Sequence, residues 1–160
     1  MYVRRAARVV LLNPADEVLL LRSRFRSEIP GLEWAWFVPG GGLEPGESVG
    51  RAAVRELAEE TGIELDEERL VPIAYAEGFG TLGTLSGPMR DDFFLARVAE
   101  SRVSTDAMAE YERAALGDHR WWPLPELVRT DQPIVPGGLA GLLVDYLAAP
   151  EWSRPRSLPW

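Results

Sequence analysis

The chain has 160 residues, of which 46% are hydrophobic and 26% are charged, with no cysteine and a formal net charge of −8. These values are typical of a globular protein with one sizeable core, and they argue against disordered, fibrous and disulfide-rich classes. The negative charge disfavours binding to nucleic acid or to an anionic membrane surface, and no apolar run reaches the roughly 20 residues that a membrane-spanning helix needs.

Short apolar runs separated by turn residues predict strands in the first part of the chain. The runs are rich in Val and Leu, and Asn, Pro, Asp and Gly stand between them. We expect strands at 6–12, 18–22 and 36–38, a turn at 13–17 and a loop at 23–35. Pro39 and the glycines at 40–42 end the last of these strands and predict a rigid loop.

A helix is predicted next, and strands and helices alternate in the rest of the chain. Ser48 is a favourable N-cap and Gly62 a favourable stop, so we expect the helix between them. Further on, we expect strands at 70–79, 91–98 and 119–124, a helix at 107–116, a helical turn at 125–128 and a closing helix at 137–149. Residues 80–88 are predicted to be a flexible connector and residues 149–160 an irregular, Pro-rich tail. This order predicts a mixed α/β or α+β sandwich in a single domain, residues 1–160.

Three glutamates share one face of the predicted helix. Glu56, Glu59 and Glu60 stand at positions i, i+3 and i+4. The apolar stripe of the helix is expected at Val49, Ala53 and Leu57, with Val54 and Ala58 beside it. Like charges at this spacing destabilise an isolated helix by roughly 0.2–0.5 kcal/mol per pair. The face is therefore either a solvated acidic surface or a site for a hard divalent cation such as Mg²⁺, which takes oxygen ligands and binds substrate phosphates as well.

The glycines before the helix add a second feature. They let the backbone approach other groups closely, so the carbonyl of Gly40 or Gly41 could reach a metal ion. Together, the loop and the helix resemble the Nudix box, whose pattern is G-x5-E-x7-R-E-U-x-E-E-x-G-U with U an aliphatic residue. Its defined positions are filled by Gly41, Glu47, Arg55, Glu56, Leu57, Glu59, Glu60, Gly62 and Ile63. The segments 5–22 and 119–127 also resemble the opening hairpin and the late strand of that family.

The resemblance implies a fold, an activity and a set of metal ligands. Nudix proteins typically have an α/β/α sandwich with a mixed β-sheet, and they use Mg²⁺ or Mn²⁺ to hydrolyse a nucleoside diphosphate linked to another moiety. By this similarity, the metal ligands would be Glu56, Glu59, Glu60 and the backbone of Gly41. The bound metal would neutralise the diphosphate, orient the substrate and acidify a water molecule.

The resemblance also implies roles for charged residues around those ligands. Arg55 would pair with a glutamate of the box, Glu47 or Glu59, and hold it in place. Glu59 is the first choice for the catalytic base. Glu112 and Asp118, which lie outside the box, are the alternatives for the base, and a solvated surface charge is the plainer role for each of them.

Substrate contacts are predicted from residues before the box. Arg22 and Arg24 alternate out of the second strand, so they are candidates to contact the diphosphate. Trp36 is a candidate to stack on a base. A charged edge strand for the arginines and core packing for the tryptophan are the alternatives. The box alone does not define the substrate beyond a small molecule of nucleotide type.

Two alternative functions of this fold are each disfavoured by one feature of the sequence. A non-catalytic Nudix-like module that binds a nucleotide metabolite as a regulator is one alternative, but such modules commonly lose box carboxylates, and this chain keeps all of them. The isomerase branch of the same fold depends on a catalytic cysteine, which is missing here. We expect a cytoplasmic protein with no nucleic-acid or membrane partner. A homodimer formed through the apolar C-terminal helix is an open alternative.

Overall fold

The computed structural model describes residues 1–24, 30, 33–99 and 102–160. Its strands are β1 (Arg4–Leu12), β2 (Val18–Arg24), β3 (Trp34–Phe37), β4 (Gly40–Gly42), β5 (Val71–Leu82), β6 (Leu85–Arg97), β7 (Leu116–Trp122), β8 (Ile134–Val135) and β9 (Arg156–Leu158). Its helices are α1 (Val49–Thr61), α2 (Glu110–Ala115), α3 (Leu124–Arg129) and α4 (Leu139–Ala148), with a 3-10 turn at Glu67–Arg69. No helix in these described ranges has the length and the apolar composition needed to cross a membrane.

The strands of the described residues form one mixed sheet. Its order is β8-β3-β2-β1-β6-β5-β9, with β4 paired to β1 and β7 paired to β2. The pairs β1–β6, β3–β8 and β5–β9 are parallel, and the other pairs are antiparallel. The mixed β-sheet predicted from the sequence is therefore confirmed.

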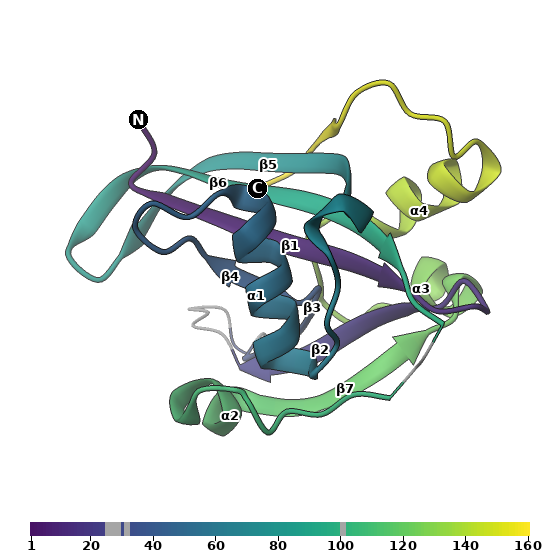
Figure 1. Ribbon diagram of the computed structural model, residues 1–160, viewed down its shortest axis with the longest axis horizontal. Helices are drawn as coiled ribbons and strands as arrows, with labels where there is room; N and C mark the ends of the chain where they lie inside the picture. The colour runs from purple at the N-terminus through teal and green to yellow at the C-terminus, as the bar shows by residue number, and fades with distance from the viewer. Residues whose placement is uncertain (25–29, 31–32, 100–101) are drawn as a thin grey trace.

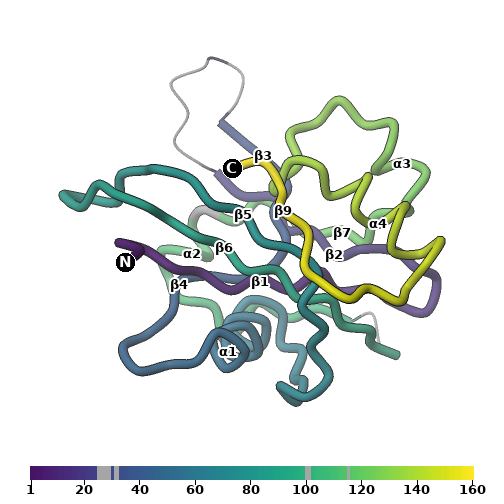
Figure 2. The backbone as a smooth tube through the Cα atoms, turned by 90° about the horizontal axis from the view of Figure 1, so that it is seen from above, coloured from purple at the N-terminus to yellow at the C-terminus, as the bar shows by residue number. Residues whose placement is uncertain are grey.

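Helices cover both faces of the sheet, which gives the predicted α/β/α layers. Figure 2 shows α1 on one side of the strands, and α3 and α4 on the other. The side chains of β1 explain this arrangement, because successive side chains of a strand point to opposite faces of the sheet. Val9 and Leu11 pack in the apolar cluster that contains Leu57 of α1, whereas Val10 and Leu12 pack in the cluster that contains four side chains of α4.

The two central strands diverge soon after they meet. β1 and β2 share the residue pair Leu12–Val18, and β2 then pairs with β3 and β7. β4 pairs along β1 instead, with Gly41 opposite Ala7. The chain from β3 to β4 thus crosses between the diverging strands, and it then enters α1 through the loop 43–48, as Figure 1 shows. The glycine segment is therefore a short strand, and the prediction of a loop at 40–42 is wrong.

The predicted flexible connector at 80–88 is also wrong, because β5 and β6 form one long hairpin. Leu82 pairs with Leu85, and the turn between them contains Gly83 at φ 62°. The hydroxyl oxygens of Thr81 and Ser86 are 2.7 Å apart across the ladder. Pairing that starts in the apolar parts of both strands continues outward, and a glycine in the left-handed region closes the turn.

The segment 149–160 is not wholly irregular, because it contains β9. Ala76 of β5 pairs with Leu158, whose side chain is only 8% exposed and belongs to the cluster on the α4 face. The prolines of the segment exclude a helix, but three consecutive residues between them remain free to pair with the edge of β5. This long-range pairing leaves no local signal in the sequence.

Several predicted boundaries shift by a few residues. β2 and β3 extend into the predicted loop at 23–35, of which 25–29 and 31–32 lie outside the described residues. The helix predicted at 107–116 is limited to α2, and the strand predicted at 119–124 begins earlier, as β7. The helical turn predicted at 125–128 and the closing helix predicted at 137–149 are found as α3 and α4.

Candidate functional site

The helix α1 is positioned by the two residues that were predicted to delimit it. The hydroxyl of Ser48 accepts a hydrogen bond from the Arg51 amide at 3.2 Å, which caps the N-terminus. Gly62 ends the helix at φ 72°, and its amide donates to the Ala58 carbonyl. Both caps follow from short-range sequence patterns, so the sequence defined this helix correctly.

The buried face of α1 differs from the predicted apolar stripe. Its buried residues are Ala52, Ala53, Glu56, Leu57 and Thr61. Val54 and Ala58, which were expected beside the stripe, are only partly buried. Glu56, by contrast, is only 7% exposed. The helix is therefore rotated so that one of its glutamates lies at the edge of the core and not on the solvated side.

Three carboxylates meet beside this helix. Oxygen atoms of Glu56, Glu60 and Glu112 all lie within 4.8 Å of one another. Glu56 and Glu60 come from successive turns of α1, and Glu112 comes from α2, where its carboxylate accepts a hydrogen bond from the Ala109 amide at 3.2 Å. We call these three side chains the carboxylate cluster. The sequence predicts Glu112 only as an alternative base, because nothing local indicates that α2 folds back beside α1.

Burial disfavours negative charge in the carboxylate cluster. It raises the pKa of Glu60 from 4.5 to about 8, although a hydrogen bond from the Gly40 amide and the charge of Arg8 oppose the shift. It also raises the pKa of Glu56, against the opposing hydrogen bond and charge of Arg55. Burial and neighbouring carboxylates raise the pKa of a carboxyl group, and a nearby cation lowers it again.

Arg55 connects the glutamates of α1 with the segment before the helix. Its Nε and Nη2 atoms each donate to Glu47 at 2.9 Å, a bidentate pair. Its Nη1 atom donates to Glu56 at 2.9 Å and to Glu59 at 3.3 Å. Nη2 also donates to the Gly42 carbonyl at 3.0 Å. The hydrogen bonds from Arg55 lower the pKa of Glu47 to about 2 and, with burial opposing, raise the pKa of Arg55 itself.

The strand β4 touches the carboxylate cluster through its glycines. The Gly40 amide donates to Glu60 at 2.7 Å. A Cβ atom on Gly41 would lie 2.6 Å from the carboxylate carbon of Glu56, far inside van der Waals contact. A side chain at position 41 would therefore displace the Glu56 carboxylate, which is a steric reason for the glycine that opens the motif.

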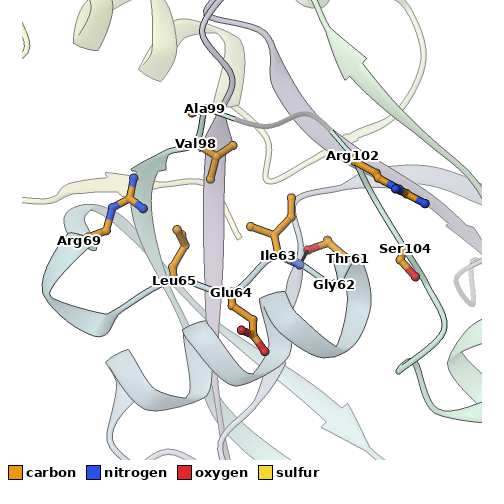
Figure 3. A pocket seen from close by; sticks show the side chains of 10 residues that line it. All are labelled: Thr61, Gly62, Ile63, Glu64, Leu65, Arg69, Val98, Ala99, Arg102 and Ser104. Atoms are coloured by element: carbon orange, nitrogen blue, oxygen red, sulfur yellow. Dashed lines mark hydrogen bonds between the residues drawn. The ribbon is translucent and has the colours of Figure 1, made fainter.

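A separate cavity lies at the C-terminal end of α1. It has a volume of about 470 Å³ and lies between Gly62, Glu64, Arg69 and Arg102 (Figure 3). No member of the carboxylate cluster lines it. This cavity past the end of the helix is thus separate from the carboxylate cluster.

Most of the chain matches one known protein family. The model of that family, described as "NUDIX domain", matches residues 3–139. The chain belongs to the Nudix family. The resemblance seen in the motif at 41–63 is thereby confirmed.

Two curated Nudix relatives align with most of this chain. The human 8-oxo-dGDP phosphatase NUDT18 is 34% identical over 121 residues, which cover 74% of this chain and 32% of that protein. An RNA pyrophosphohydrolase of Erythrobacter litoralis is 30% identical over 139 residues, which cover 81% of this chain and 82% of that one. The chain spans about a third of the length of two of the curated relatives that it matches.

A solved Nudix structure agrees with the fold. The NUDIX domain of Shewanella oneidensis NrtR, solved as a complex with ADP ribose, matches with a TM-score of 0.64. The match covers 89% of this chain and 87% of that chain at 20% identity. At this identity, the likeness shows the fold alone.

Among the glutamates of the Nudix box, Glu59 differs from its two neighbours. It does not belong to the carboxylate cluster, and its side chain is 41% exposed. Its contact with Arg55 holds it near Glu56, which shares the same Nη1 atom. The pairing expected between Arg55 and Glu47 or Glu59 is present with both glutamates. Glu59 is thus placed beside the cluster and open to solvent.

The predicted substrate contacts lie away from the carboxylate cluster. Arg22 and Arg24 pair with Trp36 and Trp34 on neighbouring strands, so they share the face of the sheet opposite α1. Both guanidinium groups lie over the ring of Trp34, at 4.8 and 5.0 Å from its centroid. Trp36 is 7% exposed, and its ring meets Trp122 edge-on at 5.2 Å. Its burial fits the packing alternative and leaves no open face for stacking on a base.

Asp118, the second alternative for the base, is also separate from the cluster. It is exposed on β7, where it pairs across the ladder with Arg22. Its carboxylate accepts a hydrogen bond from the His119 amide at 2.7 Å. It is not a member of the carboxylate cluster, whereas Glu112, the other alternative, is.

Proposed function

We propose that the chain hydrolyses a phosphoanhydride bond in a nucleoside diphosphate linked to another moiety, with Mg²⁺ or Mn²⁺ held by the carboxylate cluster. The observation that supports this most directly is the convergence of Glu56, Glu60 and Glu112 within 4.8 Å. Three oxygen donors from three acidic side chains are the ligand type that hard divalent cations prefer. The intact Nudix box favours catalysis over a binding module without activity.

The dimensions of the carboxylate cluster fit such an ion. In an octahedral Mg²⁺ site, ligand oxygens stand about 2.1 Å from the ion, which places neighbouring oxygens about 3 Å apart and opposite ones about 4.2 Å apart. The spread of 4.8 Å in the cluster differs from this range by less than about 1 Å, which rotation of glutamate side chains can supply. The raised pKa values of Glu56 and Glu60 would be reversed by a bound cation.

A backbone ligand is better supplied by Gly40 than by Gly41. Pro39 accepts from the Val9 amide, and Leu43 donates to the Arg5 carbonyl. Alternation along the ladder therefore directs the amide and carbonyl of Gly41 toward β1. The groups of Gly40 are directed away from that ladder, and its amide already bonds Glu60. We therefore move the proposed carbonyl ligand from Gly41 to Gly40.

The side chains around the cluster have separable roles in this proposal. When bound, the metal supplies charge neutralisation and an acidified water molecule. Glu59 is the base that takes a proton from the attacking water, because it is exposed and stands next to the cluster. Glu112 replaces Glu59 as the third carboxylate ligand. Arg55 is a positioning residue that fixes the directions of Glu56 and Glu59 through one nitrogen atom.

The substrate is a small molecule of nucleotide type. The names of the relatives, an 8-oxo-dGDP phosphatase and an RNA pyrophosphohydrolase, both point to nucleotide phosphoanhydrides. A panel of nucleoside diphosphates and triphosphates, ADP-ribose and diadenosine polyphosphates, incubated with Mg²⁺ and with the phosphorylated products separated by anion-exchange chromatography, tests the proposal. We expect turnover of at least one compound that is abolished by EDTA. Binding of a nucleotide without any hydrolysis across the panel would favour the non-catalytic module instead.

A further inference from the structure

Arg8 of β1 bonds the backbone oxygen that was proposed above as a metal ligand. Its Nη1 atom donates to the Gly40 carbonyl at 3.2 Å, and the amide of the same glycine donates to Glu60 at 2.7 Å. Arg8 stands opposite Gly40 in the pairing of β1 with β4, and a Cβ atom on Gly40 would lie 2.7 Å from Cγ of Arg8. The stem of the arginine therefore lies directly against the glycine, and its head stays within reach of the carbonyl.

A buried carboxylate holds the rest of this guanidinium group. Nε of Arg8 donates to Asp91 of β6 at 2.7 Å, and the side chains of Arg8 and Asp91 are only 14% and 12% exposed. Arg4 bonds the other oxygen of Asp91 at 3.2 Å. A charge-assisted N–H···O bond is typically about 2.7–2.9 Å long. The bond to Asp91 is therefore the firm anchor of Arg8, and the longer bond to Gly40 is the one that yields more easily.

Arg8 and a cation in the carboxylate cluster would compete for the Gly40 carbonyl. A cation bonded to this oxygen at about 2.1 Å would stand no more than about 5 Å from Nη1 of Arg8. Two positive groups at that separation repel each other, and one long hydrogen bond gains little in comparison. Because the carboxylates attract the cation and Asp91 retains Arg8, each positive charge keeps a partner when the two groups separate.

We propose that Arg8 and the metal cation exchange at the Gly40 carbonyl, so that Arg8 restrains cation uptake by the carboxylate cluster. Without a cation, Nη1 satisfies the carbonyl. When a cation binds, Nη1 leaves the carbonyl and Nε stays on Asp91. Arg8 lines a cavity of about 350 Å³ on the face of the sheet opposite α1, so water there can accept a hydrogen bond from the released nitrogen. This inference rests on the proposed function, because it concerns the regulation of the same metal site.

Three variants separate the hydrogen bond of Arg8 from its charge. Arg8→Met removes both. Arg8→Lys keeps a positive charge beside Asp91, but an ammonium group lacks the second arm that reaches Gly40. Arg4→Met is the matched control, because Arg4 lies on the same strand and bonds the same carboxylate, and within the described residues its bonds do not include Gly40.

The first measurement is the affinity of each folded chain for Mn²⁺ alone, by titration followed with electron paramagnetic resonance. Arg8→Met and Arg8→Lys should both bind Mn²⁺ roughly 3- to 10-fold more tightly than the wild-type chain, because no hydrogen bond has to be given up. Arg4→Met should keep the wild-type affinity. If Arg8→Met does not fold, Arg8→Lys and the second measurement decide.

The second measurement follows the guanidinium protons of Arg8 in the wild-type chain. NMR of a chain labelled with ¹⁵N-arginine reports their exchange with water, and the Arg8 signals are assigned by their loss in Arg8→Lys. Saturating Mg²⁺ should speed the exchange of the Nη1 protons and leave the Nε proton, which Asp91 holds, unchanged. Exchange that Mg²⁺ does not alter at Nη1 would overturn the proposal.

The outcomes separate this inference from the proposed function. Unchanged or weaker Mn²⁺ binding in both Arg8 variants refutes the exchange, and so does tighter binding in only one of two folded Arg8 variants or equally in Arg4→Met. In each of these cases the hydrolase proposal stands if the wild-type chain hydrolyses a nucleotide. Tighter binding in both Arg8 variants, with no compound of the panel hydrolysed, supports the exchange and contradicts the proposed reaction. Absence of Mn²⁺ binding in every chain refutes both.

Discussion

Arg55 is the residue that gives the acidic face of α1 a fixed geometry. It donates to Glu47, Glu56 and Glu59 and to the Gly42 carbonyl. A lysine could not supply this set of bonds, because an ammonium group lacks the planar fork of a guanidinium. The repulsion expected among the glutamates is thus offset in part by one arginine, and the proposed cation would compensate the rest.

Because Glu59 and Glu60 have different surroundings, we expect replacement by glutamine to have different effects at the two positions. Glu59→Gln removes the proposed base, so turnover should fall by roughly 10²- to 10⁴-fold while Mg²⁺ binding persists. Glu60→Gln removes a proposed ligand, so Mg²⁺ affinity and turnover should fall together. Steady-state kinetics and Mg²⁺ titration of both variants check this contrast.

Glu64→Gln is the matched control for the Glu59→Gln and Glu60→Gln variants. Glu64 is exposed beside the separate cavity at the end of α1, as Figure 3 shows, and it should keep wild-type kinetics. Equal turnover in Glu59→Gln and wild type would remove Glu59 from its role. Unchanged Mg²⁺ affinity in Glu60→Gln would likewise remove Glu60 from the ligand set.

The ion pair of Glu47 with Arg55 predicts a loss of stability in acid. The pKa of Glu47 is about 2 in the folded chain, below its ordinary value of 4.5. A lowered pKa stabilises the fold above the ordinary value, and that contribution is lost as the pH falls from about 4.5 toward 2. Urea unfolding at pH 7, 5 and 4 should show Glu47→Gln less stable than wild type at pH 7, with the difference shrinking at lower pH. A constant difference across this range would contradict the argument, and exposed Glu151→Gln serves as the control.

Among the structural elements, β4 is the one whose backbone lies against the carboxylate cluster. Gly41→Ala would place a methyl carbon 2.6 Å from the Glu56 carboxylate, so it should displace Glu56 and lower turnover by roughly 100-fold or more. Gly42→Ala is the matched control, because a Cβ there would meet only the Arg5 carbonyl at 4.0 Å. Steady-state kinetics and Mg²⁺ titration of both variants test whether the effect comes from the contact with Glu56. Equal losses at the two positions would show that the strand, and not the contact with Glu56, is what matters.

Elements with local signals were predicted well from the sequence, and elements made by distant pairing were not. Ser48 and Gly62 delimit α1 through hydrogen bonds that span only a few residues, so its bounds could be predicted. The strand pairing of Gly41 with Ala7 involves residues far apart in the chain and was missed. The hairpin of β5 and β6 is not predicted, because its glycines also indicate a flexible connector.

The same distinction holds for the candidate site. The motif placed Glu56 and Glu60 together, because they are one turn apart. Glu112 joins them only through the packing of α2. No pattern at short spacing marks this contact. The sequence therefore identified the acidic helix but not the residues that complete the site around it.

At the scale of the whole molecule, β9 joins the end of the described chain to the sheet. Leu158→Ala would leave space in the core on the α4 face, so it should lower the free energy of unfolding by about 2–4 kcal/mol. Ser157→Ala, exposed on the same strand, should have little effect. Denaturant unfolding of both variants measures the difference. A change below about 0.5 kcal/mol in Leu158→Ala would show that the segment does not belong to the core.

Uptake of a divalent cation by the carboxylate cluster is the property on which the proposed reaction depends. Mn²⁺ titration, followed by electron paramagnetic resonance, measures it directly in the wild-type chain, in the double variant Glu56→Gln/Glu60→Gln and in Glu64→Gln. We predict that the wild-type chain and Glu64→Gln bind Mn²⁺, that Mg²⁺ competes for the site, and that the double variant loses this binding. A wild-type chain that takes up no Mn²⁺, or a double variant that binds it equally well, would contradict the account.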